Sequence, residues 1–376
     1  MATFNKRITE LSKYSLLSFL TIRECRYAYD EPYFTDRVEE LARIGQFLKS
    51  KNHLVLISPR RYGKSSLVRK AVRESGRPYV WVNMQQVLSR EDFAAKLLKS
   101  IFKQYKMEKV KHFLRNFRVL PSVSVNPMTD EMSVTFQPLV DSQAVFEDSM
   151  ALLGEVSSAE HRLVVVFDEF QDILEIDKHI DRELRAIMQE QMNINYILLG
   201  SQESMMADIF ESPKSPFYHF GMLMRLSKIP QKDFLRYLQD RLSPVTVNSE
   251  DIARKILSFT DNHPYYTQQL ASAIWGLIAL GKGDADVFDN AIADIVQAHD
   301  LDYERLWLTF NKTDQLMIRL VCQGSNPVKS RMLPTSTMTS SLKRLAQKGY
   351  IINREKDDYA MEDPFFKKWI VQQQQL

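Results

Sequence analysis

Residues 54–66 read LVLISPRRYGKSS, an apolar run that ends in a short basic loop. The run at 54–57 predicts a buried strand, and the residues from Ser65 onward predict a helix. A strand, a loop and a helix in this order are typical of a phosphate-binding loop, because the free amides at a helix N-terminus attract anions. The stretch therefore predicts a site for the phosphates of a nucleotide.

Several residue types in the loop support this prediction. Gly63 lets the backbone crowd the phosphates, Lys64 offers a charge to the β- and γ-phosphates, and the Ser65 hydroxyl can ligate Mg²⁺. The loop departs from the pattern GxxxxGK[ST] at its first position, where Ser58 replaces glycine. The alternative is a basic turn between a strand and a helix, without a ligand.

A second stretch, LVVVFDEFQDI at 163–173, begins with five apolar residues, as a central strand buried on both faces requires. It ends in Asp168 and Glu169, at the edge of a sheet where α/β proteins place ligands. We expect Asp168 to hold Mg²⁺ and Glu169 to act as general base for the attacking water. The alternative is a strand that runs into a solvated turn, and the basic loop upstream favours the functional interpretation.

A further buried strand is predicted at 195–199, NYILL, and it is followed by Gly200. A polar residue just past this strand, Ser201 or Gln202, can contact the γ-phosphate or the attacking water.

The length of 376 residues predicts two or three domains. Patterns along the chain indicate an α/β core followed by helical segments. The predicted division is an N-terminal helical extension at 1–30, a nucleotide-binding core at 31–229 with a β-hairpin near 117–138, a helical lid at 230–299, and a winged-helix domain at 300–376.

Composition excludes some classes. The net charge of +3 is too small to imply a partner by itself, and Cys25 and Cys322 alone make no disulfide framework. No stretch approaches 18 uninterrupted apolar residues, so no membrane partner is expected. These features predict a cytoplasmic protein.

Seven separated stretches agree in order with one protein family. They are FTDRVEEL at 34–41, SPRRYGKSSL at 58–67, LVVVFDEFQDI at 163–173, YILLGSQESMM at 196–206, SPFYHFGMLMRL at 215–226, HPYYTQQL at 263–270 and YAMEDPFFKKWI at 359–370. Over roughly residues 30–370 the sequence resembles the archaeal-type ATPase family, which is also found in bacteria. This family is a branch of P-loop ATPases close to the AAA+ and STAND proteins.

The resemblance implies a P-loop NTPase core with a parallel sheet of order 5-1-4-3-2, a helical lid and a C-terminal winged helix. It implies that Asp168 and Glu169 are the magnesium-binding and catalytic acids and that Ser201 or Gln202 is the sensor after the fourth strand. ATP would be cradled, after Ser58, by Pro59, Arg60, Arg61, Tyr62, Gly63, Lys64, Ser65 and Ser66. Members often place adenine against the segment that begins here with Phe34 and includes Arg37, and against a lid proline that corresponds to Pro264.

The chain also departs from the family pattern. Many members carry an arginine beside the segment SPFYHF, which acts on the γ-phosphate of a neighbouring subunit. Here those positions are Lys214, His219 and Phe220, with Arg225 further along. His263 also stands in the lid motif where glycine is common.

The tetrapeptide NKTD at 311–314 matches the guanine-recognition pattern NKxD of GTPases. That motif has to follow a sheet strand beside the base, whereas here it follows the segment 301–310. We interpret it as the start of a helix at 312–323, with Asn311 or Thr313 as acceptor for the first turn.

The segment 301–376 holds twelve Lys and Arg residues against eight Asp and Glu residues, a net charge of +4. Lys343, Arg344 and Lys348 lie on the predicted recognition helix and could contact the phosphates of duplex DNA. The alternative is a solvated basic helix in a protein-docking module, since the fold cannot decide between the two.

Three functions therefore remain open. The first is a slow, Mg²⁺-dependent ATPase of the AAA+ type that binds ATP and ADP and acts as a nucleotide-driven switch. The second is a DNA-binding regulator, or an adaptor of a mobile element or defence system, in which hydrolysis is secondary. The third is an interaction protein that holds a nucleotide and contacts a protein partner or further copies of itself.

Overall fold

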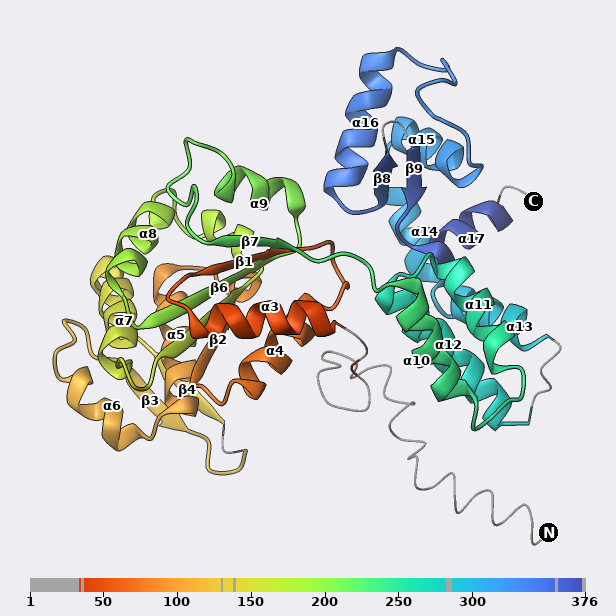
Figure 1. Ribbon diagram of the computed structural model, residues 1–376. Coiled ribbons are helices and arrows are strands. Elements are labelled where there is room, and N and C mark those ends of the chain that lie inside the picture. Colours follow the sequence, from red (N-terminus) through yellow and green to blue (C-terminus); the bar gives the residue numbers. More distant parts are fainter. Residues whose placement is uncertain are drawn as a thin grey trace, which may run out of the picture. The chain divides into compact units, whose positions relative to one another are not determined.

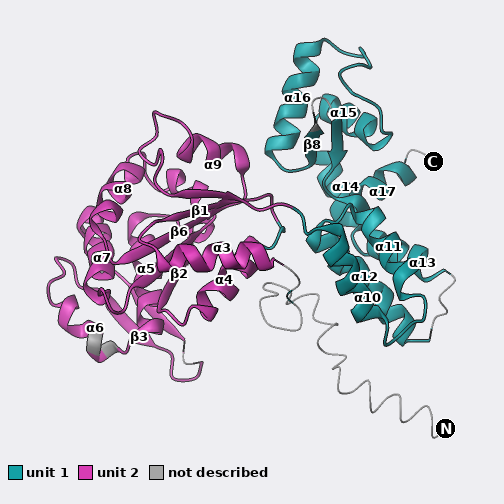
Figure 2. Ribbon diagram, in the orientation of Figure 1, with its two compact units in different colours: residues 1–36, 61–63, 228–376 teal, residues 37–60, 64–227 magenta. Residues whose placement is uncertain are grey.

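The structure is a computed structural model that describes residues 34, 37–129, 131–137, 140–281, 286–355 and 358–373. The helix expected within residues 1–30 lies outside the described residues. By their contacts the residues form two compact units, which Figure 2 shows in different colours. Unit 2 comprises residues 37–60 and 64–227, and unit 1 comprises residues 61–63 and 228–376 together with the N-terminal residues up to 36.

Unit 2 is built on a five-stranded sheet in which every neighbouring pair is parallel. The order across the sheet is β2-β5-β6-β1-β7. When the five strands are numbered in chain order, this order reads 2-3-4-1-5, so the predicted order 5-1-4-3-2 is confirmed. The strands are β1 (Leu54–Ile57), β2 (Tyr79–Asn83), β5 (Leu163–Asp168), β6 (Ile194–Gly200) and β7 (Met222–Arg225).

Burial explains why these segments form strands. Every residue of β1, β5 and β6 is buried, as the continuous apolar runs predict for strands covered on both faces. The edge strand β2 instead alternates buried with half-buried residues. The polar residues that follow β1, β5 and β6 therefore lie at the carboxyl edge of the most buried part of the sheet.

Helices cover both faces of this sheet, with α3 and α4 on one face and α5 and α7 on the other (Figure 1). Ser89 caps the start of α5 by accepting from the Asp92 amide, and Asp141 caps α7 in the same way. The helices of unit 2 are α3 (Val38–Lys49), α4 (Lys64–Glu74), α5 (Arg90–Gln104), α6 (Met107–Leu114), α7 (Ser142–Val156), α8 (Ile180–Glu190) and α9 (Glu203–Phe210), with short 3₁₀ helices η1 (Met84–Gln86) and η2 (Phe170–Glu175).

A β-hairpin decorates unit 2 in the segment where the alternating pattern predicts one. Strands β3 (Ser122–Val125) and β4 (Met132–Thr135) pair antiparallel, with Ser122 opposite Thr135. Val134 of β4 is buried in the core of the unit, where it packs among the side chains under α5. The hairpin is therefore anchored to the sheet domain by its apolar face.

Unit 1 is mainly helical. Buried residues from Ile229 to Ile370 form one hydrophobic cluster, so the segments that the sequence divides at about residue 300 share a core. The division into a lid and a separate winged helix stays a prediction. The helices are α10 (Gln231–Leu242), α11 (Ser249–Thr260), α12 (Pro264–Ala279), α13 (Val287–Ala298), α14 (Asp300–Thr309), α15 (Lys312–Cys322), α16 (Thr335–Gln347) and α17 (Pro364–Gln373).

The C-terminal part of unit 1 has the order helix, helix, strand, strand that the sequence predicts. Strands β8 (Ile351–Glu355) and β9 (Asp358–Met361) follow α16 and pair antiparallel, with Ile351 opposite Met361. At the start of α15 the Asn311 side chain accepts from the Asp314 amide at 2.8 Å. The NKTD tetrapeptide is therefore a helix cap, as predicted.

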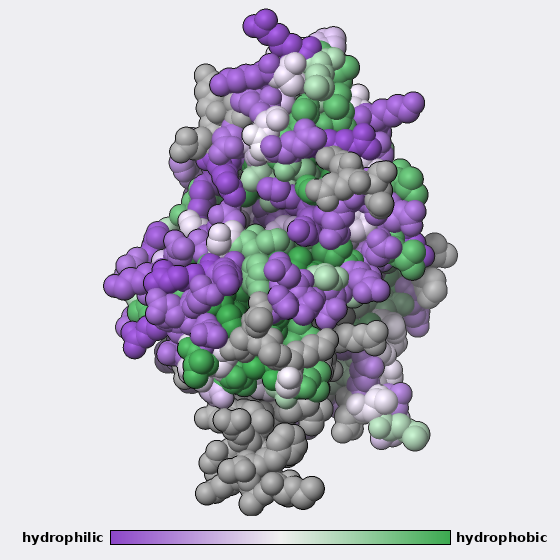
Figure 3. All heavy atoms as spheres, turned by 90° about the vertical axis from the view of Figure 1, so that its right-hand side faces the viewer, coloured by the Kyte–Doolittle hydropathy of each residue, from purple (hydrophilic) through white to green (hydrophobic). Residues whose placement is uncertain are grey.

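On the face of the molecule shown in Figure 3, hydrophobic residues are interspersed with hydrophilic ones. Within the described part of the chain, no helix combines the length and the apolar character needed to cross a membrane.

Candidate active site

The loop between β1 and α4 has the geometry of an anion-binding site. Gly63 has a φ of +88°, and Arg61 also adopts the left-handed region with a φ of 66°. Within the described residues, the amides of Arg60, Arg61 and Gly63 donate to no protein acceptor. These amides and those in the first turn of α4 are therefore available to phosphate oxygens.

Ser58, which replaces the first glycine of the motif, has a structural role. Its amide donates to the Gly200 carbonyl at 3.2 Å, which continues the pairing of β1 with β6, and its side chain is completely buried. Ser58 does not adopt a positive φ, so the position needs no glycine. The departure from GxxxxGK[ST] therefore leaves the loop conformation intact.

Lys64 begins α4 and is almost completely buried, at 7% exposure. Its Nζ lies 2.6 Å from Oε1 of Glu169. An ammonium group has three N–H donors, so this pair leaves two of them for phosphate oxygens.

Ser65, the next residue, contacts the other acid. Its Oγ donates to Oδ2 of Asp168 at 2.8 Å. Asp168 is the last residue of β5 and is buried, and this burial raises the pKa of its carboxyl, although Lys64 and Ser65 oppose the shift. A hydroxyl and a carboxylate in contact at a strand end are hard oxygen donors of the kind that Mg²⁺ prefers.

Glu169 follows β5 in the left-handed conformation, with a φ of 54°. Its Oε2 accepts from Ser201 Oγ at 2.6 Å, from the Ser201 amide at 3.2 Å and from Gln171 Nε2 at 2.8 Å. Burial works to raise the pKa of Glu169, but Lys64, Ser201 and Gln171 together lower it. The carboxylate is therefore ionised at neutral pH.

Of the two residues predicted after β6, the structure brings only Ser201 into contact with the acids. A Cβ at Gly200 would lie 2.2 Å from Sδ of Met206, so a larger residue just before Ser201 would force the Met206 side chain to move. The Ser201 hydroxyl also accepts from Arg60 Nε at 3.4 Å. Gln202 is half-buried at the start of α9, and its side chain caps no helix amide.

The remaining loop residues make different contacts. Pro59 and Ser66 are half-buried. Arg61, which belongs to unit 1, lies with its guanidinium 4.4 Å from the centre of the Tyr265 ring and donates to the Tyr266 hydroxyl at 3.4 Å. Within the same unit, the Tyr62 ring packs edge-to-face on His263. The Arg61 side chain is therefore engaged within unit 1, while its backbone amide has no acceptor among the described residues.

The residues expected at adenine are divided between the units. Arg37 is the N-cap residue that precedes α3 in unit 2, is buried and pairs with Glu40 at 2.8 Å. Phe34, which is half-buried, and Pro264, the buried first residue of α12, belong to unit 1. Their contact with adenine stays a prediction.

The structure adds one residue that the sequence interpretation missed, Gln171. It is completely buried and donates to Glu169, while its Oε1 has no hydrogen-bond partner in the described residues. Its place two positions after Glu169, between Phe170 and Asp172, was the signal that could have indicated it. Arg225, considered as a trans-acting residue, forms an ion pair with Glu211.

Comparisons with known proteins bear on the family and the fold of the chain. A family described as "ATPase domain predominantly from Archaea" matches residues 34–270. A comparison with curated protein sequences found no match.

Among solved structures, the chain is similar to a Walker-type ATPase of Pyrococcus abyssi, with a TM-score of 0.64, 19% identity and coverage of 92% of this chain and 98% of that one. It is also similar to the ORC2 protein of Aeropyrum pernix, solved as ADPNP and ADP complexes (TM-score 0.54, 13% identity, coverage 93% and 98%). The ORC1 protein of Aeropyrum pernix, solved in complex with DNA, has a TM-score of 0.52 and 11% identity, with coverage of 93% and 96%. At these identities the likenesses show a shared P-loop NTPase fold. Because the family match spans more than half of the sequence, the chain belongs to the family of ATPase domains found predominantly in Archaea.

Proposed function

We propose that this protein binds ATP with Mg²⁺ on the loop at 58–66, hydrolyses it slowly and uses the bound nucleotide as a switch. One observation carries the proposal: Lys64 and Ser65 at the start of α4 contact Glu169 and Asp168 at the end of β5. A cation, a hydroxyl and two acids thus meet beside free loop amides, which is the set of groups that phosphoryl transfer requires.

The residues present fit a magnesium ion together with a nucleotide triphosphate. Ser65 and Asp168 would hold the metal, and the two remaining donors of Lys64 would bind phosphate oxygens. When bound, Mg²⁺ supplies positive charge that offsets the charge of the phosphates.

Glu169 is the proposed general base. It accepts a proton from water as the water oxygen attacks the γ-phosphorus and the bond to the β–γ bridging oxygen breaks, which yields ADP and phosphate. Ser201 and Gln171 hold its carboxylate in place, and Ser201 in turn contacts Arg60. Gln202 remains the alternative sensor.

Turnover is proposed to be slow. Where an arginine finger is supplied, it accelerates phosphoryl transfer by about 10³- to 10⁵-fold. The family resemblance implies such an arginine beside the segment at 215–220, where this chain has Lys214 and His219, and Arg225 is paired with Glu211. The proposal therefore includes no trans-acting arginine, whether the protein works alone, with a protein partner or as a homo-oligomer.

The switch is supported by the contacts of Arg61. This loop residue makes its side-chain contacts inside unit 1, on Tyr265 and Tyr266 of α12. A nucleotide that changes the backbone conformation at Arg61 would therefore change the contacts of the Arg61 side chain with α12, a helix outside the sheet.

Steady-state phosphate release tests the proposal. We expect release from ATP that depends on Mg²⁺ and stops in EDTA, together with calorimetric binding of ATP and ADP. Absence of ATP and ADP binding at millimolar concentration would contradict the proposal, as would preference for GTP.

A second candidate function is binding of duplex DNA by residues 300–376. It is favoured by the order α15, α16, β8, β9, by the net charge of +4 in residues 301–376, and by the similarity to the ORC1 protein that was solved with DNA. A mobility-shift assay at about 50 mM salt, where phosphate contacts are strong, tests it. Failure to shift any duplex would end this candidate and favour a protein-docking role.

A further inference from the structure

The Arg60 side chain connects two of the strand ends that form the candidate active site. Arg60 lies in the loop after β1 and is exposed, and it belongs to unit 2 together with the other residues of this contact. Its Nε donates to Oγ of Ser201, the residue after β6, at 3.4 Å. The Ser201 hydroxyl in turn donates to Glu169, the proposed base, at 2.6 Å. One hydroxyl group therefore separates the guanidinium from the carboxylate that would activate the water.

The charge of Arg60 also acts on the polar residues that follow β5. Burial raises the pKa of the Asp172 carboxyl, Glu175 and Glu169 raise it further, and Arg60 opposes the shift. Within the part of the chain that the structure describes, Arg60 nevertheless forms no ion pair, and both of its Nη atoms are without an acceptor. The Nη donors of a planar guanidinium are therefore available to a ligand at this edge of the sheet.

The other two cations of the loop at 58–66 already have partners. Lys64 is almost completely buried and pairs with Glu169. The Arg61 side chain makes its contacts inside unit 1, on α12. Among the described residues, Arg60 is thus the one loop cation that is both exposed and without a carboxylate partner.

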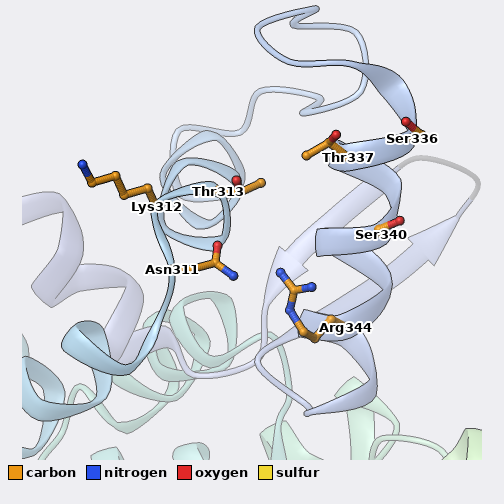
Figure 4. A pocket seen from close by; sticks show the side chains of 7 residues that line it. All are labelled: Asn311, Lys312, Thr313, Ser336, Thr337, Ser340 and Arg344. Atoms are coloured by element: carbon orange, nitrogen blue, oxygen red, sulfur yellow. The ribbon is translucent and has the colours of Figure 1, made fainter.

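An arginine of unit 1 shows the opposite situation. Arg344 lines a polar groove of about 600 Å³ between the start of α15 and α16 (Figure 4). Its guanidinium pairs with the buried carboxylate of Asp314. The charge of Arg344 is therefore balanced within the protein, whereas that of Arg60 is left for an anionic ligand.

We propose that Arg60 is the arginine that stabilises the γ-phosphate in cis during hydrolysis, an inference that rests on the proposed function. An arginine with this role can come from a neighbouring subunit or from the same chain. In this arrangement the Nη donors of Arg60 contact γ-phosphate oxygens. The water oxygen attacks the γ-phosphorus and passes its proton to Glu169, while the electron pair of the breaking bond goes to the bridging oxygen of ADP.

The expected effect of Arg60 is on the rate and not on the affinity for the nucleotide. Negative charge is redistributed over the γ-phosphoryl and leaving oxygens in the transition state, so hydrogen bonds from a fixed guanidinium are stronger there than in the bound substrate. Ser201 holds this guanidinium through Nε and holds Glu169 through the same hydroxyl. ADP has no γ-phosphate, so its binding should not depend on Arg60.

The test compares the parent with Arg60→Ala and with a matched control, Arg115→Ala. Arg60 does not adopt a positive φ, so alanine is compatible with the loop backbone. Arg115 is the exposed C-cap of α6, and its side chain has no partner among the described residues. Calorimetry measures the affinities for ATP, for ADP, and for ADP with aluminium fluoride and Mg²⁺, which imitates the transferred phosphoryl group. Single-turnover assays measure hydrolysis, and thermal melting checks that both variants are folded.

We expect Arg60→Ala to hydrolyse ATP about 10²- to 10³-fold more slowly than the parent, because one donor to the transition state is lost. Its affinity for ADP should stay within about twofold, and its affinity for ADP with aluminium fluoride should fall at least about tenfold. The control should match the parent in every measurement.

Two results would overturn the inference while ATP hydrolysis by the protein stands. Hydrolysis by Arg60→Ala at the parent rate would show that Arg60 does not act on the γ-phosphate. Equal losses of affinity for ADP and for ADP with aluminium fluoride would show that Arg60 only holds the loop or the nucleotide as a whole. If the parent neither binds ATP nor releases phosphate, the proposed function fails together with this inference.

Discussion

The ammonium group of Lys64 and the carboxylate of Glu169 lie 2.6 Å apart, with side-chain exposures of 8% and 15%. This pair joins the start of α4 to the end of β5 across 105 residues of sequence. Because both groups are largely buried, the removal of either one leaves a charge that is difficult to bury alone. A substitution of either residue should therefore affect the stability of the folded protein as well as nucleotide binding or hydrolysis.

Replacement of Lys64 by alanine should abolish ATP binding measured by calorimetry. The variant removes the ammonium group that faces the terminal phosphates and leaves the loop glycine in place. Lys70→Ala, farther along the same helix and paired with Glu74, is the matched control and should bind ATP normally. Retention of ATP affinity within a factor of about three, less than 1 kcal/mol, would show that Lys64 does not contact phosphate.

Replacement of Asp168 by asparagine should raise the melting temperature at neutral pH, measured without nucleotide. Burial raises the pKa of this carboxyl, so its ionised form costs stability as the pH rises through the folded-state pKa, and the neutral amide avoids that cost. The same variant should lose Mg²⁺-dependent phosphate release. Asp208→Asn, an exposed position on α9, is the control.

A lower melting temperature for Asp168→Asn at neutral pH would contradict the argument from burial. Unchanged dependence on Mg²⁺ would contradict the assignment of Asp168 as a metal ligand.

His53 should make the protein less stable in acid. Burial, together with Arg185 and Arg162, lowers the pKa of His53 from 6.5 to about 4. The unfolded chain therefore binds the proton more readily, and the stability that the neutral ring provides is lost as the pH falls from about 6.5 towards 4. The ring accepts from the Tyr196 amide at 3.3 Å and stacks on Phe220.

The variant that tests this is His53→Asn. Its free energy of unfolding in urea should fall less between pH 7 and pH 5 than that of the parent, by about 1–2 kcal/mol. Equal losses in both proteins would show that another group causes the acid sensitivity.

Local sequence was sufficient for the parts of the fold that depend on local burial. The runs at 54–57 and 163–167 are apolar at every position because both faces of β1 and β5 are covered, and this signal is visible without any partner. The Asn311 cap was also readable, because a side chain and an amide three residues apart suffice to form it. The strand order, however, came from the family resemblance, since no local pattern names the neighbour of a strand.

The parts that could not be predicted depend on tertiary contacts. Nothing near Ser201 in the sequence indicates that its hydroxyl contacts Glu169. The sequence also could not show that Ser58 has a negative φ, which any residue can adopt. Helix α17 was missed although a signal existed: Asp363 precedes Pro364, and its side chain accepts from the amides of Phe365 and Phe366.

The central claim is that the loop at 58–66 binds ATP and that Glu169 activates the water. Its most direct test is to measure ATP affinity and single-turnover hydrolysis in the same samples of the parent, of Glu169→Gln and of the exposed control Glu175→Gln. We expect Glu169→Gln to bind ATP at least as tightly as the parent and to hydrolyse it about 10²- to 10⁴-fold more slowly, because the amide keeps the shape and removes the base. The control should match the parent in both measurements. Hydrolysis by Glu169→Gln at the parent rate would show that another group activates the water and would contradict the account.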